Sequence, residues 1–324
     1  MRVGAIRTLL LAVIAALVWP AVALAQSWPT RPVTFIVPFP AGGNVDVLAR
    51  AVAAELSEKL GQQFIVDNRA GAGGNIGGAV VAKAAPDGYT MLFGTPGPIA
   101  TNKLMYKNLP YDPEKDLSPV VLVSKSPLII VAHPSTPAKD LKELIAYAKA
   151  NPNKINAGNP GNGTLGHITS ELLQQHAGIK MTHVPYRGTT PLTTDLLGGQ
   201  VHIGMDFMPT YVPLVNDGRL RALAVTSSER SPELPNVMTV REAGFPGFEA
   251  TAWYAIVAPA GTPAEIAQKI NAATNDYLKS QKGKAQLVQF SMQAAGGTPG
   301  DLKTFIASEL QKWGPIIKAA NISM

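Results

Sequence analysis

The alternation of apolar strand-like runs, glycine turns and amphipathic helices near the start of the chain most constrains its fold. Residues 33–39 (VTFIVPF) are apolar and rich in β-forming residues, which is typical of a strand buried on both faces of a parallel sheet. A glycine turn follows at once. From Val45 to Leu60 the apolar side chains recur at helical spacing, and Gly61 is placed to end that helix.

The same alternation continues through two further strands. Residues 63–68 predict the second strand, the glycine cluster GAGGNIGG at 71–78 opens a helix that Pro86 stops, and residues 90–94 (TMLFG) predict a third strand. This β-α-β-α-β order predicts a parallel, doubly wound sheet, because strands that helices connect return to the same sheet in parallel. We therefore expect an α/β fold.

A long apolar stretch at 120–132 (VVLVSKSPLIIVA) predicts a strand that leaves this first domain and enters a second. Residues 253–258 (WYAIVA) predict the return crossing, so that two strands form a hinge. The remaining elements repeat the theme: we expect helices at 141–150, 165–176, 191–197 (with Thr190 as N-cap), 263–278 and 299–319, and strands at 155–157, 182–185, 201–207 and 220–226.

Two domains are expected from this order. The first comprises residues 26–125 and 251–324, and the second comprises residues 126–250. Without its first 25 residues the chain keeps 299 of 324 residues, which is enough for two hydrophobic cores.

The first 25 residues have the pattern of a cleavable signal peptide. A positive start precedes an apolar run at 8–22, and an AxA motif ends at Ala25, which predicts cleavage before Gln26. A membrane anchor is the alternative, but the run falls short of the ~20 residues that span a bilayer. The chain has no cysteine, which excludes a lipidated N-terminal thiol and disulfides. We expect a freely diffusing periplasmic monomer.

The loop after the first predicted strand is the first candidate site, because open parallel sheets bind ligands beyond the carboxyl ends of their strands. In PFPAGG (38–43) the glycines let the backbone N–H groups of Gly42, Gly43 and Asn44 face an anion at a helix N-terminus. Asp46, in the first helical turn, either caps the helix or accepts a hydrogen bond from a ligand hydroxyl or amine.

Two loops of the second domain are the natural partners for the far end of a ligand. In GNGTLGH (161–167), Thr164 is an N-cap or a ligand contact, and His167 donates to a carboxylate or serves the structure. Arg187 offers a two-pronged fork to a carboxylate or forms a solvated salt bridge. Asp206, at the end of a buried strand, accepts from a ligand or from the neighbouring loop.

The predicted ligand-binding residues share a position directly after a strand or in the first turn of the next helix. They are Phe39, Pro40, Ala41, Gly42, Gly43, Asn44, Asp46, Thr95, Asn162, Gly163, Thr164, His167, Tyr186, Arg187 and Asp206.

The second glycine cluster does not fit a dinucleotide site. Gly71 and Gly73 match the first half of GxGxxG, but Ile76 stands at the third glycine position, and the cluster follows the second strand instead of the first. We interpret these glycines as allowing close helix packing, and we expect no cofactor.

Catalytic and metal-binding patterns are missing from the sequence. The chain has no cysteine, none of the HExxH, GxSxG, SxxK or GxxxxGK[ST] motifs, and its histidines (His133, His167, His176, His183 and His202) lack metal spacing. We therefore predict a protein that is not an enzyme and holds no metal. The net charge of +6 favours anionic ligands, whereas the scattered lysines and arginines do not indicate nucleic-acid binding.

Six ordered motifs resemble a known family. PFPAGGNVDVLAR, DNRAGAGGNIGG, APDGYT, HVPYRG, DLLGGQV and REAGFPGF together are similar to the Bug family, the TctC-like extracytoplasmic binding proteins of tripartite tricarboxylate transporter systems. The resemblance covers essentially the whole mature chain. It implies a periplasmic-binding-protein fold of type II that closes like a Venus flytrap.

The resemblance also implies a ligand. In that family the loop matching Phe39 to Asp46 holds a carboxylate mainly through main-chain groups and waters, and the loop matching Gly161 to His167 meets the other end. Members bind citrate, dicarboxylates, acidic amino acids or aromatic acids, and some pass them to a membrane permease. We expect the ligand to favour the closed form by contacting both domains. A ligand-sensing partner of a membrane sensor kinase is the alternative, and an enzyme is a third hypothesis.

Overall fold

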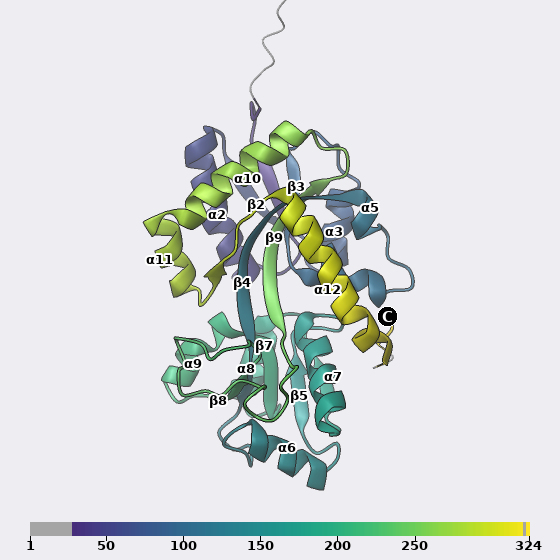
Figure 1. Cartoon of the computed structure of the whole chain (residues 1–324), viewed down its shortest axis with the longest axis vertical. Coiled ribbons are helices and arrows are strands. Elements are labelled where there is room, and N and C mark those ends of the chain that lie inside the picture. Colours follow the sequence, from purple (N-terminus) through teal and green to yellow (C-terminus); the bar gives the residue numbers. More distant parts are fainter. Residues whose placement is uncertain (1–27, 320–321) are drawn as a thin grey trace, which may run out of the picture. The chain divides into compact units, whose positions relative to one another are not determined.

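The computed structural model describes residues 28–319 and 322–324 (Figure 1). The predicted signal peptide at 1–25 lies outside these residues. The chain from Arg31 to Met324 forms one compact unit, which contains the helices and strands of the described residues. Within the described part, no helix combines the length and apolarity that a membrane crossing requires.

Helices and strands alternate along the described chain. The strands are β1 (Val33–Val37), β2 (Phe64–Asn68), β3 (Thr90–Gly94), β4 (Leu117–Ala132), β5 (Asn156–Asn159), β6 (Thr182–Pro185), β7 (Ile203–Phe207), β8 (Arg221–Val225), β9 (Thr251–Pro259) and β10 (Gln293–Ala294). The longer helices are α2 (Asn44–Leu60), α3 (Asn75–Ala82), α6 (Leu141–Ala150), α7 (Leu165–Ala177), α8 (Thr189–Leu197), α10 (Ala264–Lys279), α11 (Gln281–Gln289) and α12 (Pro299–Ala319). The short α-helices are α4 (Pro96–Ile99), α5 (Pro113–Asp116) and α9 (Val212–Asn216), and the short 3-10 helices are η1 (Ala72–Gly74), η2 (Thr101–Leu104) and η3 (Met208–Thr210).

The strands follow the same local order in both halves of the structure. In the first half β1 pairs in parallel with β2 and β3, and in the second half β5 pairs in parallel with β6 and β7. The orders β2-β1-β3 and β6-β5-β7 are thus equivalent, and antiparallel β9 and β4 stand between them. The parallel, doubly wound arrangement predicted from the sequence is confirmed in each half.

Strand β4 belongs to both halves. Its residues from Leu117 to Pro127 pair with β9, whereas Leu128 to Ala132 pair with β7 and β8. It runs between the two groups of helices in Figure 1, beside β9. The sequence predicted β4 and β9 as the two strands that cross between domains; β4 pairs in both halves, whereas β9 pairs with β3 and with the first part of β4. The domain boundaries drawn from it stay a prediction.

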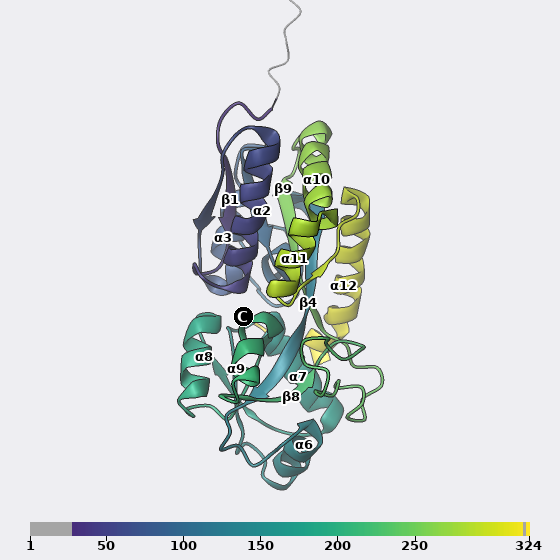
Figure 2. The same cartoon turned by 90° about the vertical axis from the view of Figure 1, so that its left-hand side faces the viewer.

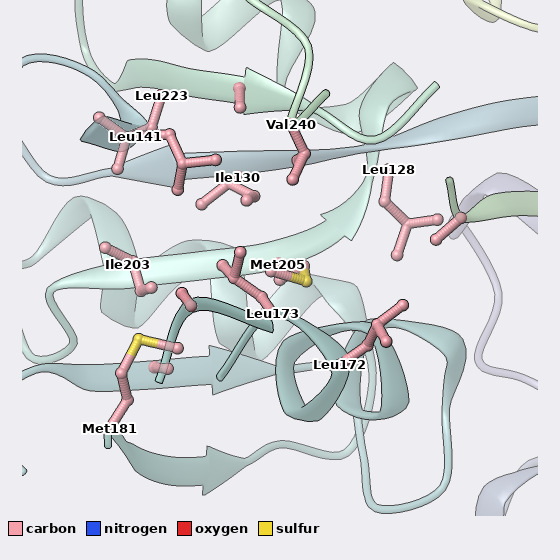
Figure 3. Packing of buried hydrophobic residues seen from close by; sticks show 14 of the residues in the cluster. Leu128, Ile130, Leu141, Leu172, Leu173, Met181, Ile203, Met205, Leu223 and Val240 are labelled. Carbon is pink, nitrogen blue, oxygen red and sulfur yellow. The ribbon is translucent and has the colours of Figure 1, made fainter. Parts of the chain in front are cut away.

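Buried apolar side chains form a separate cluster in each half. Figure 3 shows part of the cluster of the second half, where Leu128 and Ile130 of β4 pack with Met205 of β7 and Leu172 of α7. A cluster of the first half includes Leu92, Trp253 and Leu302. Helix α12 contributes to both, because Leu302 near its start belongs to the first, and Trp313 and Ile317 near its end belong to the second.

A buried carboxylate links α12 to β9 through hydrogen bonds. Glu309 of α12 is 7% exposed, and its Oε2 accepts hydrogen bonds from the indole N–H groups of Trp253 (3.0 Å) and Trp313 (3.1 Å). Both indoles are fully buried, so the single carboxylate satisfies two donors that would otherwise be buried without a partner.

The glycine cluster after β2 serves packing, as the sequence predicted. A Cβ on Gly77 would lie 2.8 Å from the side chain of Pro38, and one on Gly78 would overlap the Tyr111 hydroxyl. One N-cap prediction is wrong: α8 begins at Thr189 with Gly188 as N-cap, not Thr190. Gly188 has φ +118°, a conformation that favours glycine, and the glycine moves the helix start by two residues.

Candidate ligand-binding cleft

Loops from both halves line one cavity at the carboxyl ends of the parallel strands. Its lining residues come from the segments after β1, β2, β3, β5 and β6 and from the end of β7: Phe39, Pro40, Gly43, Asn44, Val45, Gly73, Thr95, Pro96, Gly97, Pro160, Thr164, Leu165, Arg187, Gly188, Thr189, Thr190, Pro191, Asp206 and Phe207. Figure 2 shows α2 of the first half above α8 and α9 of the second. The site therefore lies where an open parallel sheet places its ligands.

Three helices begin at this cavity. Asn44 is the first residue of α2, Thr164 is the N-cap of α7, and Thr189 is the first residue of α8, and all three line the cavity. Helix N-termini carry backbone N–H groups without intrahelical partners and a partial positive charge. Their convergence places the partial positive charges of three helix starts at the cavity.

A hydrogen bond crosses the cleft beside α2. The hydroxyl of Thr210 in η3 donates to Oδ1 of Asn44 at 3.1 Å, which joins the second half to the first. The Nδ2 group of Asn44 is buried and has no hydrogen-bond partner among the residues that the structure describes. Since Asn44 lines the cavity, a ligand oxygen could accept this hydrogen bond.

The loop that leads into α2 is held by Asp46. This residue is 3% exposed, and its carboxylate accepts from the Gly42 N–H (2.9 Å), from Arg50 and from Asn68. Burial would raise the pKa of Asp46, but the hydrogen bonds from Arg50, Gly42 and Asn68 outweigh it, so the pKa is lowered from its usual value. Asp46 is therefore a buried and charged carboxylate in the first turn of α2.

The loop that leads into α7 is held by two side chains. The Thr164 hydroxyl caps the helix by accepting from the His167 N–H, and the Gly163 N–H donates to Nδ1 of His167 at 3.1 Å. Burial lowers the pKa of His167 to about 4, and the neighbouring His183 adds to this effect, so its imidazole is neutral at pH 7.

His167, Glu171 and His183 have side-chain atoms within 4.8 Å of one another, which is a spacing that metal ligands can have. The hydrogen bond from Gly163 argues against this use. Because Nδ1 of the neutral His167 ring accepts that bond, its proton lies on Nε2, which then has no lone pair for a metal. Nε2 lies 3.9 Å from Glu171 Oε1, which also contacts Nε2 of His183 at 2.6 Å.

Arg187 is the cation of the cavity lining. Its side chain is exposed and forms no hydrogen bond or ion pair with any residue in the described ranges, so its guanidinium is available to a ligand. The adjacent Tyr186 has another task, because its hydroxyl donates to Asp195 at 2.8 Å. Burial and the Asp195 carboxylate raise the pKa of Tyr186 to about 12.

Asp206 lies near the carboxyl end of β7 and is completely buried. Its carboxylate accepts from the Phe207 N–H at 2.7 Å, from the Tyr211 hydroxyl at 3.4 Å and from Thr189. Burial raises the pKa of Asp206 to about 6 in spite of these bonds. The residue thus joins the neighbouring loop, one of the two roles considered from the sequence, while it also lines the cavity.

The chain is similar to known proteins over most of its length. The profile of the family described as "Tripartite tricarboxylate transporter family receptor" matches residues 48–322. Protein BugT of Bordetella pertussis is 40% identical over 298 residues, which cover 91% of this chain and 90% of BugT. The chain belongs to the tripartite tricarboxylate transporter receptor family.

Solved structures of similar receptors agree with this family. Rhodopseudomonas palustris Rpa4515 with adipate has a TM-score of 0.88 and 40% identity over 91% of this chain and 99% of that chain. MatC from the same organism, with bound malate, has a TM-score of 0.84 and 34% identity over 90% of this chain and 100% of that chain. The periplasmic-binding-protein fold and the Bug, or TctC-like, resemblance are confirmed. Family and fold are those of extracytoplasmic solute-binding receptors.

About half of the residues predicted for this receptor's site meet at the cavity. Those that line it are Phe39, Pro40, Gly43, Asn44, Thr95, Thr164, Arg187 and Asp206, whereas Ala41, Gly42, Asp46, Asn162, Gly163, His167 and Tyr186 do not. Sequence reasoning missed the other lining residues, which are Val45, Gly73, Pro96, Gly97, Pro160, Leu165, Gly188, Thr189, Thr190, Pro191 and Phe207. Thr189 and Thr190 begin α8 four and five residues after the end of β6, and their hydroxyls were the signal that could have found that segment.

Asp206 is expected to make the receptor less stable as the pH rises. Its folded-state pKa lies above the unfolded value of about 3.8, so its contribution to stability is complete below pH 3.8 and is lost as the pH rises through 6. Asp206→Asn removes this loss. We expect the difference in unfolding free energy between the variant and wild type to increase by up to about 3 kcal/mol as the pH rises from 4 to 6. Above pH 6 this difference is expected to stay constant.

Urea unfolding across this pH range measures the difference. Asn216→Gln, an exposed change at the end of α9 that involves no titratable group, is the control and is expected to give a difference that does not vary with pH. A constant difference for Asp206→Asn as well would contradict the raised pKa.

Proposed function

We propose that this receptor captures a small carboxylated metabolite in the cleft between its two halves and closes around it. The observation that carries the proposal is the convergence of three helix N-termini and the unpaired Arg187 on one cavity among the described residues. Main-chain N–H groups at helix starts and a guanidinium fork both favour carboxylate oxygens. The adipate and malate bound by the two R. palustris receptors support the same chemical class.

In this proposal the ligand stabilises the closed form of the receptor. A carboxylate that contacts α2 in the first half and α7 or α8 in the second binds the closed form better than the open form, and so shifts the population toward closure. The hydrogen bond between Thr210 and Asn44 joins the two halves across the cleft. Micromolar affinity corresponds to roughly −8 kcal/mol, which a few charge-assisted hydrogen bonds supply.

The role after capture is proposed as transport. The protein is exported through its signal peptide, loads in the periplasm and delivers the acid to the membrane permease of a tripartite tricarboxylate transporter. The alternative is a sensory role, in which the loaded receptor docks on the outer domain of a membrane sensor kinase. Uptake of the labelled acid and expression of the genes for its use, both measured in a deletion strain, separate the two roles.

A thermal-shift screen tests the capture itself. Purified receptor is mixed with citrate, adipate, malate, aspartate and benzoate, each paired with its uncharged amide. A ligand that binds only the folded state raises the melting temperature by mass action. We expect at least one acid to raise it while its amide does not. Equal shifts with acid and amide, or no shift with any acid, would count against carboxylate capture.

Arg187→Gln is expected to weaken the binding of the acid found in this screen by about 10- to 100-fold, because a hydrogen bond to a charged group contributes about 1.5–3 kcal/mol. The exposed side chain makes no other described contact, so stability is expected to remain unchanged. Isothermal titration calorimetry gives both affinities. Arg219→Gln, at an exposed arginine outside the cavity lining, is the control and is expected to bind as wild type.

A further inference from the structure

The two loops that enter α2 and α7 share an arrangement that the sequence does not reveal. Each has a glycine in the left-handed region, Gly42 at φ +81° and Gly163 at φ +73°. In each, the glycine N–H donates to the side chain four residues later, which is Asp46 at 2.9 Å and His167 at 3.1 Å. The two acceptors have different chemistry but hold the same position.

Each of the two acceptors also has a charged residue beside it, four positions further along its helix. Arg50 forms an ion pair with Asp46 at 2.9 Å, and Glu171 lies 3.9 Å from Nε2 of His167. The charges differ between the halves. In α2 the anionic acceptor Asp46 forms an ion pair with Arg50, whereas in α7 the neutral imidazole of His167 has a carboxylate nearby, outside hydrogen-bond distance.

A neighbouring strand completes each arrangement. Asn68 at the end of β2 donates to Asp46 at 3.0 Å, and His183 of β6 contacts Glu171 at 2.6 Å. Strand β2 flanks β1 as β6 flanks β5, so the two side chains come from equivalent strands. The repeated unit therefore consists of a loop glycine, a helix acceptor, its charged partner and a polar group from the flanking strand.

Neither acceptor lines the cavity, although the residues beside both glycines do. Gly43 and Asn44 follow Gly42, Thr164 follows Gly163, and these three face the cleft. A glycine in the left-handed region is free to adopt many other conformations, so the loop needs an internal bond to keep one of them. The bonds to Asp46 and His167 supply it.

We propose that Asp46 and His167 are equivalent positioning residues, each of which holds its loop glycine so that the next residues present their donors to the carboxylate. The proposal rests on the proposed function for its effect on affinity. The claim that Asp46 and His167 hold their loops does not depend on a ligand, because the group that they hold is the N–H of the loop glycine.

Because the two acceptors differ in chemistry, an exchange of one for the other tests the proposal. His167→Ala removes the acceptor of Gly163. The double variant His167→Asp/Glu171→Arg places in α7 the pair that holds Gly42 in α2. Nε2 of His183, which now contacts Glu171, can accept a hydrogen bond from the introduced guanidinium. Gln175→Ala, at an exposed position of the same helix, is the matched control.

Two readouts on the complete mature receptor separate positioning from a general structural role. Amide hydrogen exchange at Gly163, followed by NMR, reports the held bond directly, and calorimetric titration with adipate reports the site. Relative to wild type, we expect His167→Ala to speed Gly163 exchange and to weaken adipate binding, each by about 10-fold, as the loss of one hydrogen bond implies. The double variant is expected to restore both to within about 3-fold, and the control to change neither.

Two results would overturn the proposal. One is unchanged Gly163 exchange in His167→Ala. The other is a double variant that melts like wild type while its Gly163 exchanges as fast as in the alanine variant. If exchange follows the expected pattern but no acid binds the wild type, carboxylate capture fails while the role of His167 in holding the loop stands.

Discussion

Gly43→Val is expected to lower the affinity for the captured acid by more than about 100-fold while the receptor stays folded. Gly43 lines the cavity at the start of α2 and has φ −79° and ψ 169°, an extended conformation that valine adopts without strain. A Cβ at this position would meet only the carbonyl oxygen of Pro40, at 3.5 Å. The added methyl groups therefore do not disturb the backbone, but they cover the N–H groups of the α2 start that are proposed to bind the ligand.

Calorimetric titration measures the affinity, and circular dichroism with thermal melting measures the fold. Gly247→Val is the matched control, because a Cβ on Gly247 meets nothing within 4 Å and the residue does not line the cavity. Wild-type affinity in Gly43→Val would place the carboxylate elsewhere. A matching loss in Gly247→Val would show that the effect is not local.

Trp313→Ala is expected to lower the free energy of unfolding by about 3–5 kcal/mol, the range typical of removing a buried tryptophan. The indole is fully buried in the core cluster of the second half, and it donates to Glu309. Its loss leaves a cavity where α12 meets this core and removes one of the two indole donors of Glu309, whose other donor is Trp253.

Chemical denaturation with urea gives the size of this effect. Val288→Ala is the control, since Val288 is 65% exposed and its truncation is expected to change stability by less than about 0.5 kcal/mol. A change below about 1 kcal/mol for Trp313→Ala would mean that the end of α12 is not part of the folded core.

Local patterns were sufficient to predict the scaffold. The uniformly apolar run that became β1 and the helical spacing from Val45 to Leu60 predicted a strand and a helix at the observed places. Because parallel strands place their carboxyl ends on one edge, the loops after them could be named as a site before any side chain was placed. Eight predicted residues, Phe39 and Thr164 among them, do line the cavity.

Tertiary contacts decided what the sequence could not. Gly42 was expected to offer its N–H group to an anion and Gly163 was predicted to contact the ligand, but the N–H group of each donates inward to a side chain four residues later. A polar residue four positions after a glycine also occurs in helices where no such bond forms, so this spacing did not predict the bond. Helix α11 was missed because its first turn depends on Ser280, whose hydroxyl accepts from the Gly283 N–H.

The continuity of β4 has a consequence for any attempt to study the halves apart. This strand lies inside the strand order, with β9 on one side and β7 on the other, and its two ends complete different sheets. A fragment that lacks it would present an unpaired row of backbone donors and acceptors, which promotes self-association. The two halves are therefore best expressed together, and a severed version would need the missing strand added back as a peptide.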